Sequence, residues 1–123
     1  MSGEQTRREV LGDAHVDRAL AAATDFTRPW QEHITETAWG AVWSRPGLDR
    51  RTRSLLTIAL LTQQHAEGEL AMHVAAAIRN GVTPDEIRET LLHTSVYAGA
   101  PAVNAAFAVA QKVLNDIVPA ADG

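Results

Sequence analysis

The amino-acid sequence predicts an all-α protein, and three features of the chain support that fold class. Apolar residues recur three or four positions apart in several segments, the spacing that places them on one face of a helix. No segment shows the convincing alternation of apolar and polar residues that is typical of a strand. Glycine and proline fall between the helical segments. Because the chain has 123 residues, 46% of them hydrophobic, and no repeat or linker, we predict one compact domain over residues 1–123 with six or seven helices.

The first half of the chain contains three predicted helices. Helical spacing of apolar residues indicates helices over residues 15–25 and about 29–43. The turn sequence RPG at 45–47 then interrupts the pattern. Asp49 is a suitable N-cap for a helix over residues 50–65. The centre of that helix, SLLTIALL, is apolar nearly all round, so we expect it to be deeply buried.

A further helix is predicted within residues 66–80, AEGELAMHVAAAIRN. Gly68 is expected to interrupt the chain just before it, and Gly81 is well placed to end it.

The last two helices have clear boundary signals. Thr83–Glu86 (TPDE) has the pattern of a capping box with proline at the first helical position, which predicts a helix over residues 84–97. AGAP at residues 98–101 ends that helix, and Pro101 can begin the last one, about 101–117. Alanine fills 22 positions, many on packing faces. Helices can therefore approach closely, within a compact bundle or between the subunits of an oligomer.

Composition excludes several classes of function. The net charge is −4 and there is no run of lysine or arginine, so we expect no nucleic-acid partner. No segment approaches the ~18 consecutive apolar residues of a membrane span. Neither does the N-terminus resemble a secretory signal, so we expect a soluble cytoplasmic protein. The chain has no cysteine, which excludes disulfides, thiolate metal ligands and thiol chemistry.

Positive charge gathers in one stretch, Ser44 to Arg53 (SRPGLDRRTR). It contains four arginines and one aspartate, a net +3 within an acidic protein. This stretch can attract an anion, or it can simply be the solvated start of a helix.

Glu69 and His73 lie one helical turn apart in the helix within 66–80. At 100° per residue, the core face of this helix consists of Leu70, Val74, Ala77 and Ile78. Ala66, Glu69 and His73 form a stripe along one edge of that face, which we expect to be neither fully buried nor freely solvated. Such an edge is where a pocket wall can form.

Three interpretations of this pair remain open from the residues alone. The pair can be an ordinary surface pair, or the histidine can simply sit at the core margin. A metal site would add His65, but Gly68 is expected to break the helix between His65 and Glu69, and no HExxH pattern occurs. We therefore predict no metal. In the third interpretation the carboxylate orients an imidazole that titrates near neutral pH, as in an acid–base couple.

Five segments together resemble the γ-carboxymuconolactone decarboxylase family. They are VLGDAHVDRAL, AWGAVWSRPGL, RTRSLLTIALL, GELAMHVAAAIRNGVTPDEI and YAGAPAVNAAF. The resemblance extends in register from about Arg8 to Leu114. It implies a small all-α unit that assembles into rings, so we expect a homo-oligomer, a trimer or hexamer.

The same superfamily includes disulfide-reducing alkyl hydroperoxidases with a Cys-x-x-Cys-x-x-x-His signature. On this sequence the signature falls on Ala66, Glu69 and His73, the three residues of the edge stripe. Because both cysteines are replaced, the resemblance implies a similar pocket without thiol peroxidase activity.

The resemblance implies loss of CO2 from 4-carboxymuconolactone, a dicarboxylate lactone, in the protocatechuate branch of the β-ketoadipate pathway. The product is 3-oxoadipate enol-lactone, and no cofactor is expected. Alternatives are a decarboxylase or isomerase of a related lactone, or a non-catalytic helical oligomer that binds a small acidic metabolite.

The resemblance and the reaction together suggest roles for several residues. His73 is the expected proton donor, or the hydrogen-bond donor to the enolate oxygen, and Glu69 sets its tautomer and charge or is itself the acid. Arg53 or Arg45 is expected to bind a substrate carboxylate. His15, in GDAHVD, matches the family pattern and is expected in a pocket or at a subunit contact.

Weaker substrate-contact candidates complete the expected site. Trp39, with Trp43 one turn on, is better suited to packing than to a pocket wall, and Tyr97 and Asn104 are further polar candidates. Histidines 33, 65 and 93 stand where the family usually has other residues, so we expect no role for them.

Overall fold

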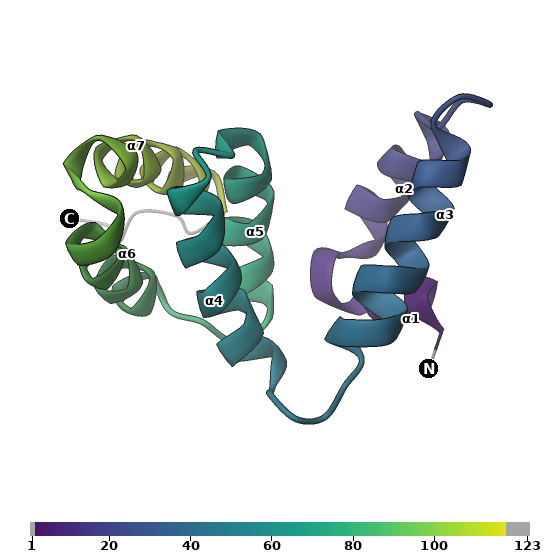
Figure 1. Cartoon of the computed structure of the whole chain (residues 1–123), viewed down its shortest axis with the longest axis horizontal. Helices are drawn as coiled ribbons and strands as arrows, with labels where there is room; N and C mark the ends of the chain where they lie inside the picture. Colours follow the sequence, from purple (N-terminus) through teal and green to yellow (C-terminus); the bar gives the residue numbers. More distant parts are fainter. Residues whose placement is uncertain (1, 118–123) are drawn as a thin grey trace. The chain divides into compact units, whose positions relative to one another are not determined.

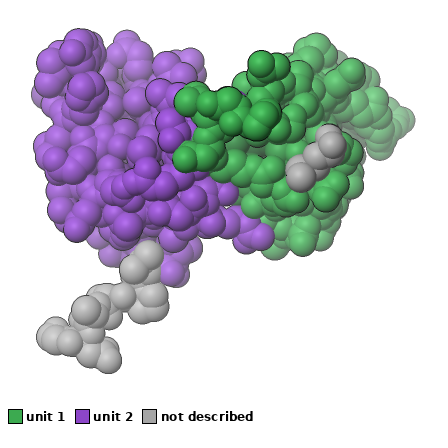
Figure 2. Space-filling view, turned by 90° about the horizontal axis from the view of Figure 1, so that it is seen from below, with its two compact units in different colours: residues 1–50 green, residues 51–123 purple. Residues whose placement is uncertain are grey.

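A computed structural model of the chain describes residues 2–117, and their regular structure is entirely helical (Figure 1). Seven α-helices, α1–α7, and one π-helical segment, η1, occur among these residues, and no strand does. The predicted all-α fold class is therefore confirmed. None of the helices in the described part is long and apolar enough to cross a membrane. Contacts divide the chain into two compact units, residues 1–50 and 51–123, which Figure 2 colours separately.

Unit 1 begins with two short helices. α1 spans Gly3–Leu11 and α2 spans Asp13–Ala21, and Gly12 between them has a φ of 93°. A positive φ is easily reached only by glycine, so Gly12 lets the chain turn sharply there. The sequence had not predicted α1, and the helix predicted for 15–25 begins and ends earlier than expected. α1 escapes the apolar pattern because its buried face contains a threonine and an arginine.

The helix predicted for 29–43 consists of two kinds of helix. α3 spans Arg28–Ile34 and passes directly into η1, Thr35–Trp43, whose hydrogen bonds have the wider π spacing. Such π segments are rare, and sequence propensity does not signal them. The Trp39 and Trp43 rings nevertheless lie on one side, with centroids 5.2 Å apart, and Trp39 is buried. η1 packs against α1 and α3.

Unit 2 contains the four remaining helices. They are α4 Arg50–Gln63, α5 Glu67–Arg79, α6 Pro84–Ala98 and α7 Ala100–Ile117. These bounds agree with the predicted helices within a few residues. Their apolar faces meet in one core, whose buried members are Ile58, Leu61, Leu70, Val74, Ala77, Val82, Ile87, Leu91, Val103, Ala106 and Ala110.

The predicted boundary signals around α5 and α6 are mostly confirmed. Gly81 has a φ of 94° just after α5. Thr83 and Glu86 form the capping box at the start of α6, each side chain accepting a hydrogen bond from the other's backbone N–H.

Two expectations for this unit were wrong. The break before α5 falls at His65, which has a φ of 56°, whereas Gly68 lies inside the first turn of α5. The SLLTIALL segment of α4 was expected to be buried nearly all round, but it is deeply buried on one face only. Leu56 and Leu60 are 50% and 61% exposed, because α4 packs on its neighbours with its other face.

Candidate functional site

α5 holds the predicted acid–base pair. Its core face is confirmed, since Leu70, Val74 and Ala77 are buried. His73 is also buried, with 7% of its surface exposed, whereas Glu69 one turn earlier is exposed. The expectation of uniform half-burial along the edge stripe was therefore wrong. Burial increases along α5 from its solvated first turn toward its centre.

Glu69 and His73 lie one turn apart on α5, but only His73 is buried, and their coupling stays a prediction. His73 alone meets the requirement for a shielded proton donor, since its imidazole is removed from bulk water and fixed on a helix whose neighbours form the core. A tautomer set by Glu69 stays a prediction.

Three further candidates lie on the other helices of unit 2. Arg53 is half-buried on α4, directly before the fully buried Ser54. Ser54 Oγ accepts a hydrogen bond of 3.1 Å from Asn80 Nδ2, which ties α4 to the end of α5. Tyr97, near the end of α6, is 78% exposed, and Asn104 on α7 is also exposed. These candidates therefore occupy three different helices around the core that holds His73.

The remaining candidates belong to unit 1. Trp39 is buried in η1, and Arg45 is exposed just beyond η1, with its backbone N–H donating to the carbonyl of Val42. His15 is half-buried on α2, and its pKa is lowered by burial and by the positive charges of Arg18 and Arg7. His15 therefore favours the neutral form near pH 7.

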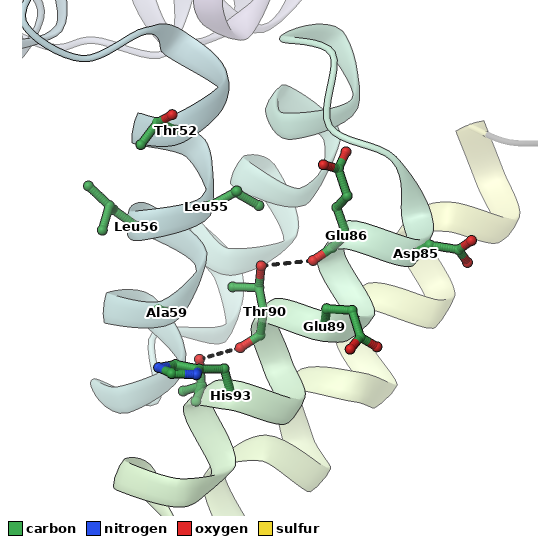
Figure 3. A pocket seen from close by; sticks show the side chains of 10 residues that line it. Thr52, Leu55, Leu56, Ala59, Asp85, Glu86, Glu89, Thr90 and His93 are labelled. Atoms are coloured by element: carbon green, nitrogen blue, oxygen red, sulfur yellow. Dashed lines mark hydrogen bonds between the residues drawn. The ribbon is translucent and has the colours of Figure 1, made fainter.

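Unit 2 has a largely apolar groove of about 580 Å³ between α4 and α6. Figure 3 shows the side chains of both helices that line it, with Thr90 and His93 on the side of α6 that faces α4 and Asp85 pointing away from α4. Its lining residues are Thr52, Leu55, Leu56, Ala59, Asp85, Glu86, Glu89, Thr90, His93 and Thr94. None of the predicted site residues is among them, although His93, which was expected to have no role, is.

The charge of this groove does not suit a dicarboxylate. Three carboxylates border it, two of them in ion pairs, Glu86 with Arg51 and Asp85 with Arg88. Glu89 is the third of these carboxylates and adds its negative charge. Like charges repel an anion, so the groove is a poor place for an acidic substrate.

Unit 1 has a second hollow, of about 800 Å³, whose wall is also acidic. Its lining residues are Gly3, Glu4, Leu20, Ala23, Arg28, Gln31, Glu32, Thr35, Glu36, Gly40 and Ala41. Again none of the predicted site residues contributes. Among the described residues, no cluster of three or more histidines and carboxylates could hold a metal ion.

Sequence reasoning missed one unusual side chain, that of Arg7. It is 7% exposed on α1, and its Nη1 donates to Gln31 Oε1 at 3.0 Å and to Thr35 Oγ1 at 3.4 Å. A signal was present, since Arg7 lies four residues after Gly3 and three before Val10, on the face that α1 buries. It was overlooked because no helix was predicted there.

These features describe a small helical protein with a buried imidazole in one unit and a buried guanidinium in the other. The chain belongs to the carboxymuconolactone decarboxylase family, whose model matches residues 28–112 and thus extends into both units.

Two relatives align over 94% of this chain. A nitrosuccinic acid decarboxylase (npaB) of Metarhizium robertsii is 55% identical over 116 residues, which cover 81% of the relative. A 4-carboxymuconolactone decarboxylase of Acinetobacter baylyi is 52% identical over 115 residues, which cover 86% of it. A 4-carboxymuconolactone decarboxylase of Pseudomonas putida is 56% identical over 39 residues, 32% of this chain and 81% of the relative.

Proposed function

We propose that the chain is a cofactor-independent decarboxylase that converts 4-carboxymuconolactone to 3-oxoadipate enol-lactone and CO2. The observation that carries this proposal is the 52% identity, over 94% of the chain, to a 4-carboxymuconolactone decarboxylase. The reaction belongs to the protocatechuate branch of the β-ketoadipate pathway. We place the protein in the cytoplasm and expect it to work as a homo-oligomer.

The substrate itself explains why no cofactor is needed. The departing carboxylate is on the ring carbon next to a C=C bond that is conjugated to the lactone carbonyl. When the C–C bond to CO2 breaks, its electron pair spreads through that double bond onto the carbonyl oxygen and forms a dienolate. A proton delivered to the carbon beside the carbonyl then shifts the double bond and gives the enol-lactone.

Nitrosuccinic acid, named for the relative from Metarhizium robertsii, is our second candidate substrate. Nitrosuccinic acid is also a dicarboxylic acid, with a nitro group on the carbon that bears one carboxyl group. Loss of that carboxylate as CO2 leaves a nitronate, which needs one proton on carbon. The 55% identity to a nitrosuccinic acid decarboxylase supports this alternative. Both substrates combine an electron-accepting group with a second carboxylate that stays behind.

Either reaction requires three kinds of group from the protein. A general acid must deliver a proton to carbon, typically contributing about 10²–10⁴-fold in rate. Hydrogen-bond donors must face the oxygen where negative charge develops, and one such donor is typically worth about 3–4 kcal/mol. A cation must hold the carboxylate that remains.

His73 is the residue we propose as the acid or as the donor to the developing oxyanion. Its burial supports this role, because an imidazole shielded from water acts more strongly on charge inside a site. Glu69, or a water molecule, is the alternative proton source. For the retained carboxylate we propose Arg53 or Arg45, and His15, Trp39, Tyr97 and Asn104 remain candidates for substrate contacts.

A two-substrate assay tests the proposal directly. The full chain, treated with a chelator, is incubated separately with 4-carboxymuconolactone and with nitrosuccinic acid, and CO2 release is measured. We expect turnover without added metal or cofactor, and the ratio of the two kcat/KM values identifies the substrate. If neither compound is decarboxylated, related lactones are assayed in the same way, and turnover of one of them would shift the assignment to that substrate. Binding without any CO2 release would favour a non-catalytic protein that binds an acidic metabolite.

A further inference from the structure

α1 buries a face that is unusually polar for an interior. Residues 3, 6, 7 and 10 recur at helical spacing and so share that face. Thr6 and Val10 have no exposed surface, and Arg7 retains 7%. Arginine is almost never buried to this extent unless its charge is paired.

Arg7 has only neutral hydrogen-bond partners in the described part of the chain. Both of its bonds leave from Nη1, to the side chains of Gln31 and Thr35. No carboxylate of residues 2–117 forms an ion pair with it. Burial lowers the pKa of Arg7, with only a partial opposing effect from Glu4. An unpaired buried charge costs free energy, so this guanidinium is a group in need of an anion.

Two polar atoms on the buried face of α1 lack a hydrogen-bond partner. Arg7 Nε and Thr6 Oγ1 are both buried and have no hydrogen-bond partner within residues 2–117. With Nη1 occupied, the edge of the guanidinium that remains is Nε and Nη2. That edge presents two parallel N–H groups, which match the two oxygens of a carboxylate.

The neighbouring arginine shows that carboxylates are not scarce in this unit. Arg8 forms ion pairs with Glu4, Asp13 and Asp17, at 3.5, 3.2 and 2.8 Å. These hydrogen bonds and charges raise the pKa of Arg8. The acidic side chains of α1 and α2 therefore gather around Arg8, on the solvated side of α1. They leave the buried charge of Arg7 unneutralised.

His15 provides a further polar group near Arg7. The positive charge of Arg7 contributes to the lowered pKa of His15, so the two groups sense each other electrostatically. The His15 ring can therefore report on a negative charge that binds at Arg7.

We propose that unit 1 contains a carboxylate-binding site centred on Arg7, with Thr6 as an additional donor, that takes a small organic acid. The carboxylate accepts the two hydrogen bonds from Nε and Nη2 and neutralises the buried charge. Because Nε is covered, the side chains over it must move aside when the ligand binds. This inference goes beyond the proposed function, since it assigns binding to a residue for which the decarboxylase proposal has no role.

Succinate, an unreactive dicarboxylate, is the probe for this site. Thermal unfolding of the full chain is followed while sodium succinate replaces sodium chloride at constant ionic strength. We expect the midpoint temperature of unfolding to rise with the succinate concentration, because a ligand that binds only the folded state stabilises it. Arg7→Gln should weaken the succinate Kd by about tenfold or more, as expected for a lost charge-assisted pair. Arg8→Gln is the matched control and should retain the wild-type Kd, because Arg8 is on the solvated side of the same helix.

A second variant and a second readout keep the test decisive. Arg7→Lys retains the charge but loses the two-pronged edge, so it should also weaken succinate binding, and it serves if Arg7→Gln fails to fold. In NMR, succinate should shift the His15 ring signals in the wild type and in Arg8→Gln but not in Arg7→Lys. A wild-type Kd in both folded Arg7 variants, or no succinate-dependent stabilisation of the wild type beyond that of chloride, would overturn the proposal.

Discussion

The two units of the chain have interiors of different character. Unit 2 is filled mainly by aliphatic side chains from four helices, and each of its buried hydroxyl groups, those of Ser54, Thr62 and Thr94, has a hydrogen-bond partner. Unit 1 buries Val10, Val16 and Trp39, but also a threonine and an arginine. Unit 2 therefore has the contacts of an ordinary stable core, whereas the interior of unit 1 contains polar groups that need partners. The difference suggests that unit 2 supplies stability and a fixed place for His73, while unit 1 supplies charge.

The largest stability effect is expected in the core of unit 2. Leu91 is 1% exposed, so Leu91→Ala leaves a cavity and should reduce the free energy of unfolding by about 2–5 kcal/mol. Leu92, the next residue, is 48% exposed, and Leu92→Ala is the matched control, with an expected change within about 0.5 kcal/mol. Denaturant unfolding measures both. Equal losses for the two variants would show that unit 2 has no specific core at Leu91.

In unit 1 the sensitive position is a close backbone contact rather than a large side chain. A Cβ added at Gly3 would lie 2.2 Å from the carbonyl oxygen of Thr35, so α1 and η1 could not keep their present spacing. Gly3→Ala should therefore cost about 1–3 kcal/mol.

Gly68 provides the control for that substitution. It lies in the first turn of α5 with nothing within 4 Å of an added Cβ. Gly68→Ala should be neutral or stabilising by up to about 1 kcal/mol, since alanine favours a helix. If Gly3→Ala were equally harmless, Gly3 of α1 could not lie against the backbone of η1 at Thr35.

The smallest effect is a dependence on pH that arises in unit 1. The pKa of His15 is lowered by burial, and then by Arg18 and Arg7, so the folded chain binds this proton less readily than the unfolded chain. Stability should fall as the pH drops below the ordinary histidine pKa of about 6.5, and the loss should level off below the lowered folded pKa. His15→Gln should remove this part of the pH dependence. The exposed His33 is the control, and an unchanged slope in His15→Gln relative to His33→Gln would contradict the assignment.

Much of unit 2 could be predicted from the sequence because its signals are local. The capping box of Thr83 and Glu86 and the stop at Gly81 depend on a few adjacent residues, and the core face of α5 follows from helical periodicity. The π-helical form of η1 and the left-handed turn at His65 depend on how segments pack, which no short pattern shows. α1 was missed because a helix that buries arginine and threonine looks solvated in the sequence.

The candidate site was predictable in part and for different reasons. Periodicity correctly placed His73 beside the core face but could not show that it is buried while Glu69 is exposed. Counting nearby arginines favoured Arg45 and Arg53, whereas the most deeply buried guanidinium belongs to Arg7, outside that charged stretch. Local charge density reports where cations are numerous, but burial decides which of them needs an anion.

The most direct test of the central claim is the rate of CO2 release by His73→Gln, measured beside Glu69→Gln on the substrate that the wild type turns over. If His73 is the proton or hydrogen-bond donor, kcat of His73→Gln should fall about 10²–10⁴-fold, while circular dichroism shows an unchanged helical fold. Glu69→Gln, at an exposed position, should lose less. A folded His73→Gln enzyme with kcat within about threefold of the wild type would contradict the role proposed for His73.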